Sequence, residues 1–357
     1  MNDQGWQSAV SMRDAKGNSQ RVTIRHVASA AGVSIATVSN VLNGRTSVAP
    51  ELVARVRTVM GELGYQRDQV ASTLRRRQTS VVGLVLPTLM SPFLAALATR
   101  LEGLAHAQGF QLLVGSANED AEQELSRVQA MLAWRVAGMI LAPVDKRFVS
   151  QSLIRDQGVK TVIVDRTSDH SDFDSVGVNN LEATLVATRR LIEVGHRRIL
   201  AVGTSRSIPN MLERITGFET AAAAAGISSS CETLCPGGDL FSIGKALHRR
   251  LQQRPLPTAV FALSDVSTLA ALQELGDRGL RMPEDVSLLG FDDHEWMQVL
   301  RPPISAVRQP TDELARHTWN RMMQRIQGDV SGASRIQLAC SLEWRASTAA
   351  PPVEVPA

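Results

Sequence analysis

Apolar residues follow a helical spacing in two short stretches between Arg21 and Asn43. The first stretch predicts a helix with one apolar face, because its apolar residues stand at i, i+3, i+4 and i+7: Ile24, Val27, Ala28 and Ala31. Thr23 is a suitable N-cap for this helix, and Gly32 is expected to end it. Ser34 is a suitable N-cap for a second helix, whose inward side chains are expected to be Val38, Val41 and Leu42. The pattern therefore predicts two short helices joined by a tight turn.

A third helix is predicted to share the same core. Pro50 suits its first position, Gly64 suits its end, and its apolar stripe consists of Leu52, Val56, Val59, Met60 and Leu63. The residues left on the outward face of the second helix are short, namely Ile35, Ala36, Ser39 and Asn40. A helix–turn–helix motif presents such a face to the major groove of DNA, where an amide such as Asn can pair with adenine. An ordinary corner between two helices of a larger fold is the alternative, since the motif alone discriminates weakly.

From Ser80 onward, apolar strand patterns alternate with amphipathic helix patterns. A first series of strands is predicted at 81–87, 111–115, 138–143 and 161–165, and a second series at 175–179, 199–203, 259–263, 286–291 and 304–310. A helix at 311–328 and a last strand at 336–345 follow. This alternation predicts two doubly wound α/β halves with parallel sheets covered on both faces. A cleft is expected between the carboxyl ends of their strands, where small polar ligands bind.

Charge is distributed unevenly along the chain. The net charge is +3, but residues 1–79 contain 11 Lys and Arg against 5 Asp and Glu, so this segment carries +6 and the remainder −3. The positive charge thus coincides with the predicted helix–turn–helix. A basic module attached to a mildly acidic body is expected when one part contacts phosphates and the other does not.

The sequence indicates neither a membrane span nor a signal peptide, because it has no apolar run of about 18 residues and its first 20 residues are polar. We therefore expect a cytoplasmic, nucleoid-associated protein. Residues 1–20 lack periodicity and are expected to form a disordered extension. The cysteines at 231, 235 and 340 form no CxxC pair and are interpreted as structural or incidental thiols.

An enzyme on a doubly wound fold is the main alternative function, since fold does not settle function. The sequence contains no GxGxxG after a strand, no GxxxxGK[ST], no GxSxG and no HExxH, and the pair His294 and Glu295 lacks a second His. We therefore expect no catalytic residue, no metal and no cofactor. A pure sugar-binding module is a third possibility, against which the basic N-terminal segment argues.

Ten motifs occur together in one order. They are VTIRHVASAAGVSIATVSNVLNG from residue 22, GY at 64–65, VASTL at 70–74, SPFLAAL at 91–97, GHRRIL at 195–200, RITGF at 214–218, SD at 264–265, GFDD at 290–293, PPISAVRQP at 302–310 and RAST at 345–348. With them the chain resembles the LacI/GalR (lactose-repressor/galactose-repressor) family of transcription regulators from about Val22 to Thr348. The resemblance implies a ligand-responsive regulator, most often a repressor, that binds a palindromic operator as a homodimer.

The resemblance also implies a domain organisation. A helix–turn–helix DNA-binding domain would span 21–67, a hinge helix 68–79, and an effector-binding and dimerisation domain similar to a periplasmic sugar-binding protein 80–348, followed by a Pro-rich tail at 349–357. Within the large domain, an N-subdomain is expected at about 80–174 plus 308–330, and a C-subdomain at about 175–304 plus 331–348. A dimer is expected instead of a tetramer, because the tail lacks the leucine heptad helix of the family's tetramers.

The resemblance places the DNA contacts at Thr23, Ser34, Ile35, Ala36, Thr37, Ser39, Asn40, Arg45, Ala71, Leu74 and Arg75. Asn40 is the main candidate for base reading, with a solvated helix residue as its alternative. Leu74 would act as the wedge that opens the central base step in the minor groove, unless it is a linker leucine that packs on its own domain. In the family pattern, His26 stands where an acid is usual and Ala49 where a Ser is usual, so we expect a less stable DNA-binding domain with its function retained.

The effector site implied by the resemblance comprises Phe93, Asn179, Arg214, Asp265, Asp292, Asp293 and Trp296. Arg214 and Asp265 would grip ligand hydroxyls or a carboxylate, because a guanidinium is a rigid donor fork and a carboxylate accepts from two vicinal hydroxyls. The effector is expected to be a sugar, a sugar acid or a nucleoside-like molecule. Structural salt bridges are the alternative for Arg214 and Asp265, and a helix N-cap is the alternative for Asp293.

Overall fold

The computed structural model describes residues 22–42, 48–65, 79–167 and 172–352. It divides the chain into two units, Met1–Gln78 and Thr79–Ala357. We describe each unit by itself.

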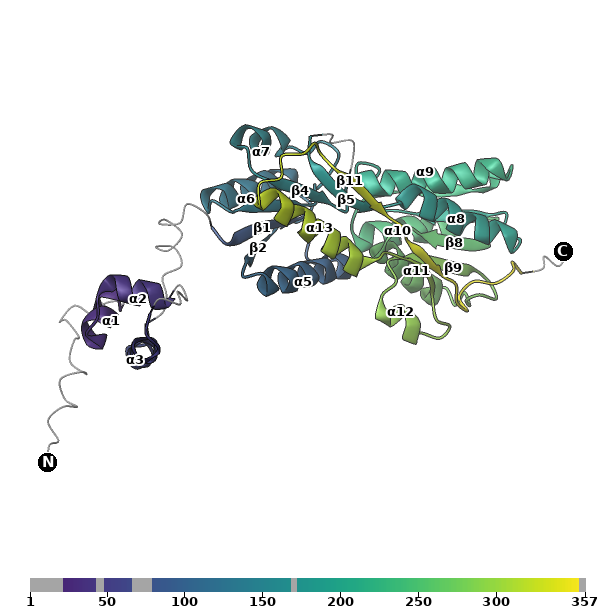
Figure 1. The fold of residues 1–357 in the computed structure, drawn as a ribbon. Helices are drawn as coiled ribbons and strands as arrows, with labels where there is room; N and C mark the ends of the chain where they lie inside the picture. Colours follow the sequence, from purple (N-terminus) through teal and green to yellow (C-terminus); the bar gives the residue numbers. More distant parts are fainter. Residues whose placement is uncertain (1–21, 43–47, 66–78, 168–171, 353–357) are drawn as a thin grey trace, which may run out of the picture. The chain divides into compact units, whose positions relative to one another are not determined.

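The first unit contains a small core shared by its described helices, α1 (Ile24–Ala31), α2 (Ile35–Leu42) and α3 (Pro50–Glu62) (Figure 1). Each helix contributes one fully buried valine to this core: Val27, Val38 and Val56. The predicted apolar stripes are confirmed with two exceptions. Leu63 follows the end of α3 and is 37% exposed, and Val53, in place of the predicted Leu52, packs against this core. Gly32 ends α1 as predicted, because its left-handed backbone (φ 60°) suits a residue without a Cβ.

The N-subdomain of the second unit is built on a parallel sheet. Its strand order is β11-β5-β4-β3-β1-β2, formed by β1 (Val81–Leu86), β2 (Gln111–Ser116), β3 (Gly138–Leu141), β4 (Thr161–Val164), β5 (Asp174–Val178) and β11 (Arg335–Leu338). Successive residues of β1 face opposite sides: Leu84 packs with α5 (Pro92–Ala107) and α13 (Thr311–Ile326), and Val85 with α6 (Ala121–Ala133) and α7 (Gln151–Gln157). Both faces are therefore covered, as the alternating pattern predicts.

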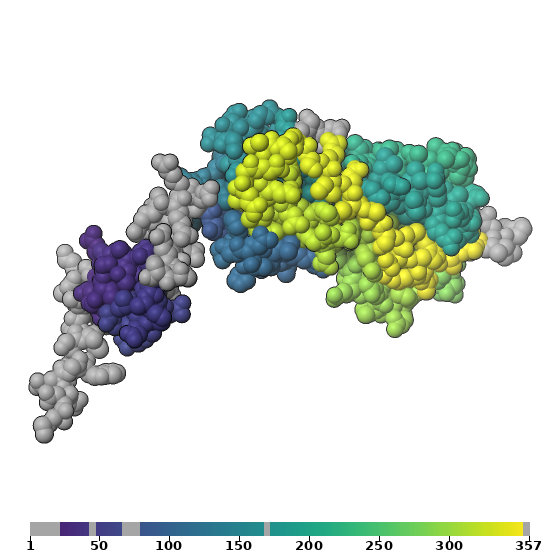
Figure 2. All heavy atoms as spheres, viewed as in Figure 1, coloured from purple at the N-terminus to yellow at the C-terminus, as the bar shows by residue number. Residues whose placement is uncertain are grey.

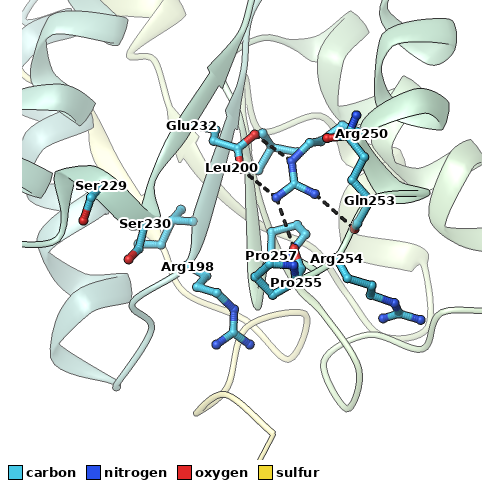
Figure 3. Close-up of a pocket in the computed structure, with 11 residues that line it drawn as sticks. Arg198, Leu200, Ser229, Ser230, Glu232, Arg250, Gln253, Arg254, Pro255 and Pro257 are labelled. Carbon is cyan, nitrogen blue, oxygen red and sulfur yellow. Dashed lines mark hydrogen bonds and ion pairs between the residues drawn. The ribbon is translucent and has the colours of Figure 1, made fainter.

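The C-subdomain repeats this architecture. Its strand order is β12-β10-β9-β8-β6-β7, formed by β6 (Ile199–Val202), β7 (Glu232–Leu234), β8 (Ala259–Ala262), β9 (Ser287–Phe291), β10 (Ser305–Arg308) and β12 (Ser341–Glu343). Helices α8 (Asn180–Glu193) and α9 (Pro209–Ala224) cover one face, and α10 (Leu240–Leu251) and α11 (Asp265–Asp277) the other. The short helices η1 (Ser228–Ser230) and α12 (Glu295–Val299) complete the subdomain, and a pocket opens beside the amino ends of β6 and β7 (Figure 3).

Two predicted subdomain boundaries are wrong. Residues 175–178 belong to the N-subdomain, because β5 pairs in parallel with β4, and residues 335–338 belong there as well, because β11 pairs with β5. The predicted last strand is in fact two strands, and β12 pairs antiparallel with β10, so the second sheet is not wholly parallel. The chain passes between the subdomains after β5, after β10 and after β11. Figure 2 shows the segment from α13 to β12 extending over both subdomains.

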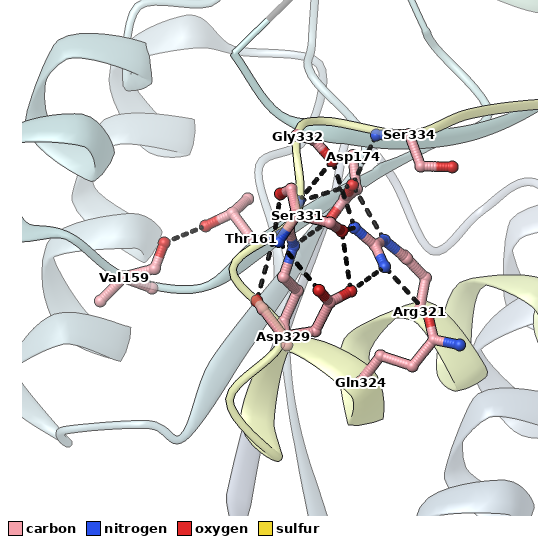
Figure 4. A network of polar contacts seen from close by, with 10 residues as sticks. Val159, Thr161, Asp174, Arg321, Gln324, Asp329, Ser331, Gly332 and Ser334 are labelled. Carbon is pink, nitrogen blue, oxygen red and sulfur yellow. Dashed lines mark hydrogen bonds and ion pairs between the residues drawn. The ribbon is translucent and has the colours of Figure 1, made fainter.

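A buried ionic network fixes β11 in the N-subdomain (Figure 4). The carboxylate of Asp174, at the start of β5, accepts from Arg325 Nε at 2.6 Å and from the backbone N–H of Ser334 at 2.7 Å. Arg321 Nε lies 2.9 Å from the same carboxylate, and its Nη1 donates to Asp329 at 2.5 Å. Burial raises the pKa of Asp174, but these donors outweigh burial and hold the pKa below its usual value. The network ties α13 and the segment before β11 to β5.

Candidate functional site

The outward face of α2 is formed by the residues predicted to meet DNA. Ser34 Oγ accepts a hydrogen bond from the N–H of Thr37 at 3.0 Å, which confirms Ser34 as an N-cap. Ile35 is 43% exposed, although it is apolar, and Ala36 is also exposed. Thr37, Ser39 and Asn40 are half-buried beside them. An exposed isoleucine at the start of a capped helix is consistent with an apolar contact to a base.

His26 contributes to the N-terminal cap of α1, although its place in the family pattern predicted a weaker cap. His26 Nδ1 accepts a hydrogen bond from the N–H of the exposed Thr23 at 3.2 Å. The imidazole therefore takes the place of the acidic acceptor in a capping box. Ala49 precedes α3 without a side-chain cap, as predicted. Arg45, Ala71, Leu74 and Arg75 lie outside the described residues.

In the second unit, polar side chains converge between the two subdomains. We call Arg214, Asp265, Asp292, His294 and Gln309 the interface cluster. Hydrogen bonds between described residues join the subdomains around it: Ser91 Oγ donates to Asp265 at 3.0 Å, Asn210 Nδ2 donates to both oxygens of Asp165 at 3.2 and 3.3 Å, and Lys146 N donates to Ser207 O at 3.1 Å.

Arg214, on α9, is held rigidly and is 3% exposed. Its Nε donates to Asn180 Oδ1 at 2.8 Å, and its Nη1 donates to the backbone carbonyl of Leu263 at 2.7 Å. The guanidinium lies 3.5 Å from the centroid of the Phe291 ring, which favours the cation over the aromatic face. Asp292 Oδ2 is 4.0 Å from Nη1, so the charge of Arg214 is balanced without a direct hydrogen bond.

Asp292 follows β9 in a left-handed backbone conformation with φ 68°, which is strained for a residue with a Cβ. Its carboxylate accepts from Gln309 Nε2 at 2.6 Å. Burial raises the pKa of Asp292 to about 6, and Asp265 adds to this while Arg214 opposes it. A buried, incompletely neutralised carboxylate is an acceptor with unused capacity.

Asp265 begins α11 immediately after its N-cap, Ser264. His294 Nε2 lies 3.7 Å from Asp265 Oδ2, and its ring stacks on Trp296 with centroids 6.4 Å apart. Burial raises the pKa of Asp265, but His294, the N–H of Val266 and Ser91 outweigh it and the pKa ends below its usual value. Burial lowers the pKa of His294, but Asp265 and Asp292 outweigh it and the pKa ends above its usual value.

Two buried polar atoms of the interface cluster, His294 Nε2 and Gln309 Oε1, have no hydrogen-bond partner among the described residues. Buried polar groups in proteins are normally satisfied. An unsatisfied nitrogen and an unsatisfied oxygen beside two carboxylates therefore point to a polar ligand at this place.

The structure does not bring every predicted residue to this cluster. The side chain of Asp293 is fully buried and accepts from Arg345 Nη1 at 2.6 Å and Arg308 Nη2 at 2.5 Å, so no surface of it remains for a ligand. Burial raises the pKa of Asp293, but the two arginines outweigh it and the pKa falls below its usual value. Asp293 thus forms structural ion pairs, which argue against its predicted place in the effector site.

Asn179 and Phe93 also have structural contacts. Asn179 Oδ1 accepts from the N–H of Cys340 at 2.9 Å, which links the segment after β5 to the segment between β11 and β12. Phe93 is 7% exposed and packs in the N-subdomain core. Trp296 is half-buried beside His294 and stays a candidate.

Comparison with known proteins identifies the family. A sequence model of bacterial regulatory proteins of the lacI family matches residues 23–68, and a periplasmic binding protein-like domain matches residues 188–348. The HTH-type transcriptional regulator CelR of Thermobifida fusca is 33% identical over 338 residues, which cover 92% of this chain and 98% of CelR. The chain belongs to the LacI family of bacterial regulatory proteins.

Solved structures of other LacI-family regulators have the same fold. The lac repressor dimer bound to operator and the anti-inducer ONPF superposes with a TM-score of 0.84 at 25% identity, covering 93% of this chain and all of that one. A complex of the transcriptional regulator CelR with cellobiose superposes with a TM-score of 0.68 at 30% identity, covering 92% of this chain and all of that one. The predicted fold class and family are therefore confirmed, and the relatives named are regulators and repressors of transcription.

Sequence reasoning missed several residues of this LacI-family site. Asn180, Asp165, His294 and Gln309 hold or complete the interface cluster, but none was selected. Their common signal is position, because each lies just after a strand, at the edge where the carboxyl ends of parallel strands meet.

In the part of the chain that the structure describes, no group of three or more His, Cys, Asp or Glu residues is placed to hold a metal ion. Within the same residues, no helix has the length and apolar character needed to cross a bilayer.

Proposed function

We propose that this LacI-family member is a dimeric, ligand-responsive repressor that binds a palindromic operator and takes a sugar or a related small polar effector between its subdomains. The observation that carries the effector proposal is the interface cluster, where two carboxylates lie beside a buried nitrogen and a buried oxygen that have no hydrogen-bond partner among the described residues.

The chemistry of the cluster suits a hydroxylated ligand. Asp265 and Asp292 can accept hydrogen bonds from vicinal hydroxyls, while Gln309 Oε1 accepts one and His294 donates or accepts another. Arg214 is fixed by Asn180 and Leu263, so the site is arranged before a ligand arrives. The complex of CelR with cellobiose supports a sugar as the effector class.

The dimer proposal is supported by exposed apolar side chains on three helices of the C-subdomain. Phe241 at the start of α10 is 78% exposed, Leu269 on α11 is 47% exposed and Val299 on α12 is 72% exposed. Three large apolar groups on one subdomain favour an interaction surface over exposure to water. The structure of the lac repressor dimer on its operator supports a second copy of the chain as the partner.

DNA binding would respond to the effector through a population shift. The effector can bias the two subdomain arrangements only through its different affinity for them, because a ligand with equal affinity shifts nothing. The bonds from Ser91 to Asp265 and from Asn210 to Asp165 join the subdomains beside the proposed ligand, so its arrival would alter them. Segment 66–78, which lies outside the described residues, would carry the change to the DNA-binding unit.

The experiment is a thermal-shift screen of the intact protein against sugars, sugar acids and nucleosides, followed by fluorescence anisotropy on a palindromic fragment from its own upstream region. We expect one ligand class to raise the unfolding midpoint and to change the affinity for DNA. Asp265→Asn should abolish the shift caused by the ligand and leave DNA affinity without ligand unchanged. A ligand response that persists in Asp265→Asn would refute the assigned site.

A further inference from the structure

Acidic side chains gather where the two subdomains meet. Asp265 and Asp292 come from the C-subdomain, and Asp165, which directly follows β4, comes from the N-subdomain. Asp165 is 4% exposed and accepts both of its hydrogen bonds from Asn210 across the interface. Asn210 and Arg214 lie one turn apart on α9, and the charge of Arg214 acts on both Asp165 and Asp292. Asp165 therefore adds a third carboxylate beside the interface cluster.

The positive charge around these carboxylates is smaller. The cations that act most strongly on them are Arg214, His294 and Arg166. Arg166 is already neutralised, because its Nη1 and Nη2 donate to the two oxygens of Glu119 at 2.9 and 2.8 Å. Arg214 is always charged, whereas His294 is charged only when it is protonated. Among the described residues, the three carboxylates thus exceed the cations in either protonation state of His294.

Arg214 has little capacity left to hold an anion. A guanidinium binds a carboxylate or a phosphate best with two adjacent N–H groups. The Nε of Arg214 donates to Asn180 at 2.8 Å, its Nη1 donates to the carbonyl of Leu263 at 2.7 Å, and the ring of Phe291 covers one face of the group. Two of its three nitrogens are therefore engaged inside the protein, which leaves mainly Nη2 for a ligand.

The buried atoms with unused hydrogen-bonding capacity include several acceptors. Gln309 is 5% exposed and donates from Nε2 to Asp292 at 2.6 Å, while its Oε1 has no hydrogen-bond partner among the described residues. The amide cannot be reversed, because Oε1 would then face the carboxylate. Asp292 Oδ2 lies 4.0 Å from Arg214 Nη1, which is too far for a hydrogen bond. A ligand at this place therefore has to donate hydrogen bonds.

The carboxylates themselves are incompletely compensated. Burial raises the pKa of Asp165, although Arg166 and Arg214 oppose the shift, and burial raises the pKa of Asp292 to about 6, although Arg214 opposes it. A negatively charged ligand would be repelled by these groups and would be buried without a cation of its own, which is costly. A hydroxyl group can donate to the same oxygens without adding charge.

We propose that the effector site binds an uncharged, hydroxyl-rich molecule and disfavours sugar acids and phosphorylated sugars because of their charge, an inference that rests on the function proposed above. Arg214 then binds a hydroxyl and not a carboxylate, which decides between the two ligand groups expected from the sequence.

The test compares molecules of one shape that differ in charge. It is isothermal titration of the intact protein with glucose, galactose and mannose, each beside its uronate and its uronamide. A uronamide has an amino group in place of one carboxylate oxygen, so it keeps the shape of the uronate and lacks its charge. We expect at least one hexose to bind together with its uronamide, and the uronate to bind at least about tenfold more weakly than the uronamide.

Asp165→Asn should lower this ratio of affinities about threefold or more, because one of the repelling carboxylates is removed. Asn tolerates the left-handed backbone at this position (φ 62°) and keeps an oxygen that can accept from Asn210. Asp277→Asn is the matched control, since Asp265 and Asp277 are the first and last residues of α11 and Asp277 is exposed. The two lie about 18 Å apart along the helix, beyond a Debye length of about 10 Å, so the control should keep the parent's ratio.

Several outcomes would overturn the proposal. If a uronate bound as tightly as its uronamide and Asp265→Asn abolished that binding, the effector site would stand and only its charge preference would be wrong. A ratio that is unchanged in Asp165→Asn, or changed equally in Asp277→Asn, would also contradict the charge preference. Absence of binding by all of these molecules would contradict the sugar effector together with the charge preference.

Discussion

Replacing Asp292 by Asn should stabilise the second unit and weaken its effector binding at the same time. Asp292 is buried and has a strained backbone, and its carboxylate lies 4.0 Å from Arg214 Nη1. Asn keeps an oxygen that can accept from Gln309 and removes the buried charge. Functional sites often retain such destabilising groups because ligand binding requires them.

The magnitude follows from the pKa of Asp292. Its shift from 3.8 to about 6 means that the folded state holds a proton that the unfolded state has released between these two pH values. Stability therefore decreases as pH rises through this window, and the ionised carboxylate costs about 3 kcal/mol above pH 6. Asp292→Asn should recover up to this amount at neutral pH, and almost nothing near pH 4.

The assay is urea unfolding of the parent protein and the variant across this pH range. Asp293→Asn is a matched control that should change the free energy of unfolding in the opposite direction. The pKa of Asp293 is lowered in the folded protein by Arg345 and Arg308, so its stabilisation is present above pH 3.8 and lost as pH falls further. Asp293→Asn should therefore destabilise the protein at neutral pH by about 3 kcal/mol, because two arginines lose their buried partner.

The reasoning would be refuted if Asp292→Asn destabilised the protein at neutral pH, or if its effect did not vary between pH 4 and pH 7. The effector found by the thermal-shift screen should also bind Asp292→Asn at least about tenfold more weakly than it binds the parent protein, since a charged acceptor is lost. A stabilised variant with unchanged effector affinity would mean that Asp292 shapes the site without touching the ligand.

Three further substitutions test other parts of the chain. Ala49→Ser should stabilise the DNA-binding unit by about 1 kcal/mol, because it supplies the missing cap of α3; a thermal unfolding midpoint equal to that of the parent would contradict this. Asn180→Ala should release Arg214 Nε and weaken effector binding about tenfold while the fold is retained, as measured by titration and circular dichroism. Leu74→Ala, which lies outside the described residues, should sharply weaken operator binding in a gel-shift assay and leave effector binding intact, and an unchanged operator affinity would exclude the wedge role.

Much of the fold could be predicted because the period of apolar residues directly reflects burial. The alternation at Leu84 and Val85 places neighbouring side chains on opposite faces of a sheet, and the spacing of Val27 and Ala31 places them on one face of a helix. Subdomain membership is different, because it depends on which strands pair. The apolar run that begins at Ser175 could join either sheet, and only its pairing with β4 decides.

At two places a predicted site residue stands next to a residue of the same type that has different contacts. Asp292 and Asp293 are the same residue type, but the positive φ at Asp292 helps to separate a carboxylate in the interface cluster from one bound by two arginines. Likewise, Asn179 bonds to the segment between β11 and β12, whereas its neighbour Asn180 positions Arg214. A backbone dihedral angle makes the first distinction and hydrogen-bond partners make the second, and residue type encodes neither.

The most direct test of the account is the salt dependence of DNA binding by the intact protein. The measurement is the dissociation constant for the palindromic fragment between about 50 and 200 mM salt, with a scrambled fragment as control. If each of two chains neutralises about three phosphates, the logarithm of the association constant should fall with the logarithm of salt concentration with a slope of about −5. Tight, salt-dependent binding that saturates at two chains per fragment is the expected result. Binding that is absent, independent of salt or equal on the scrambled fragment would contradict the account.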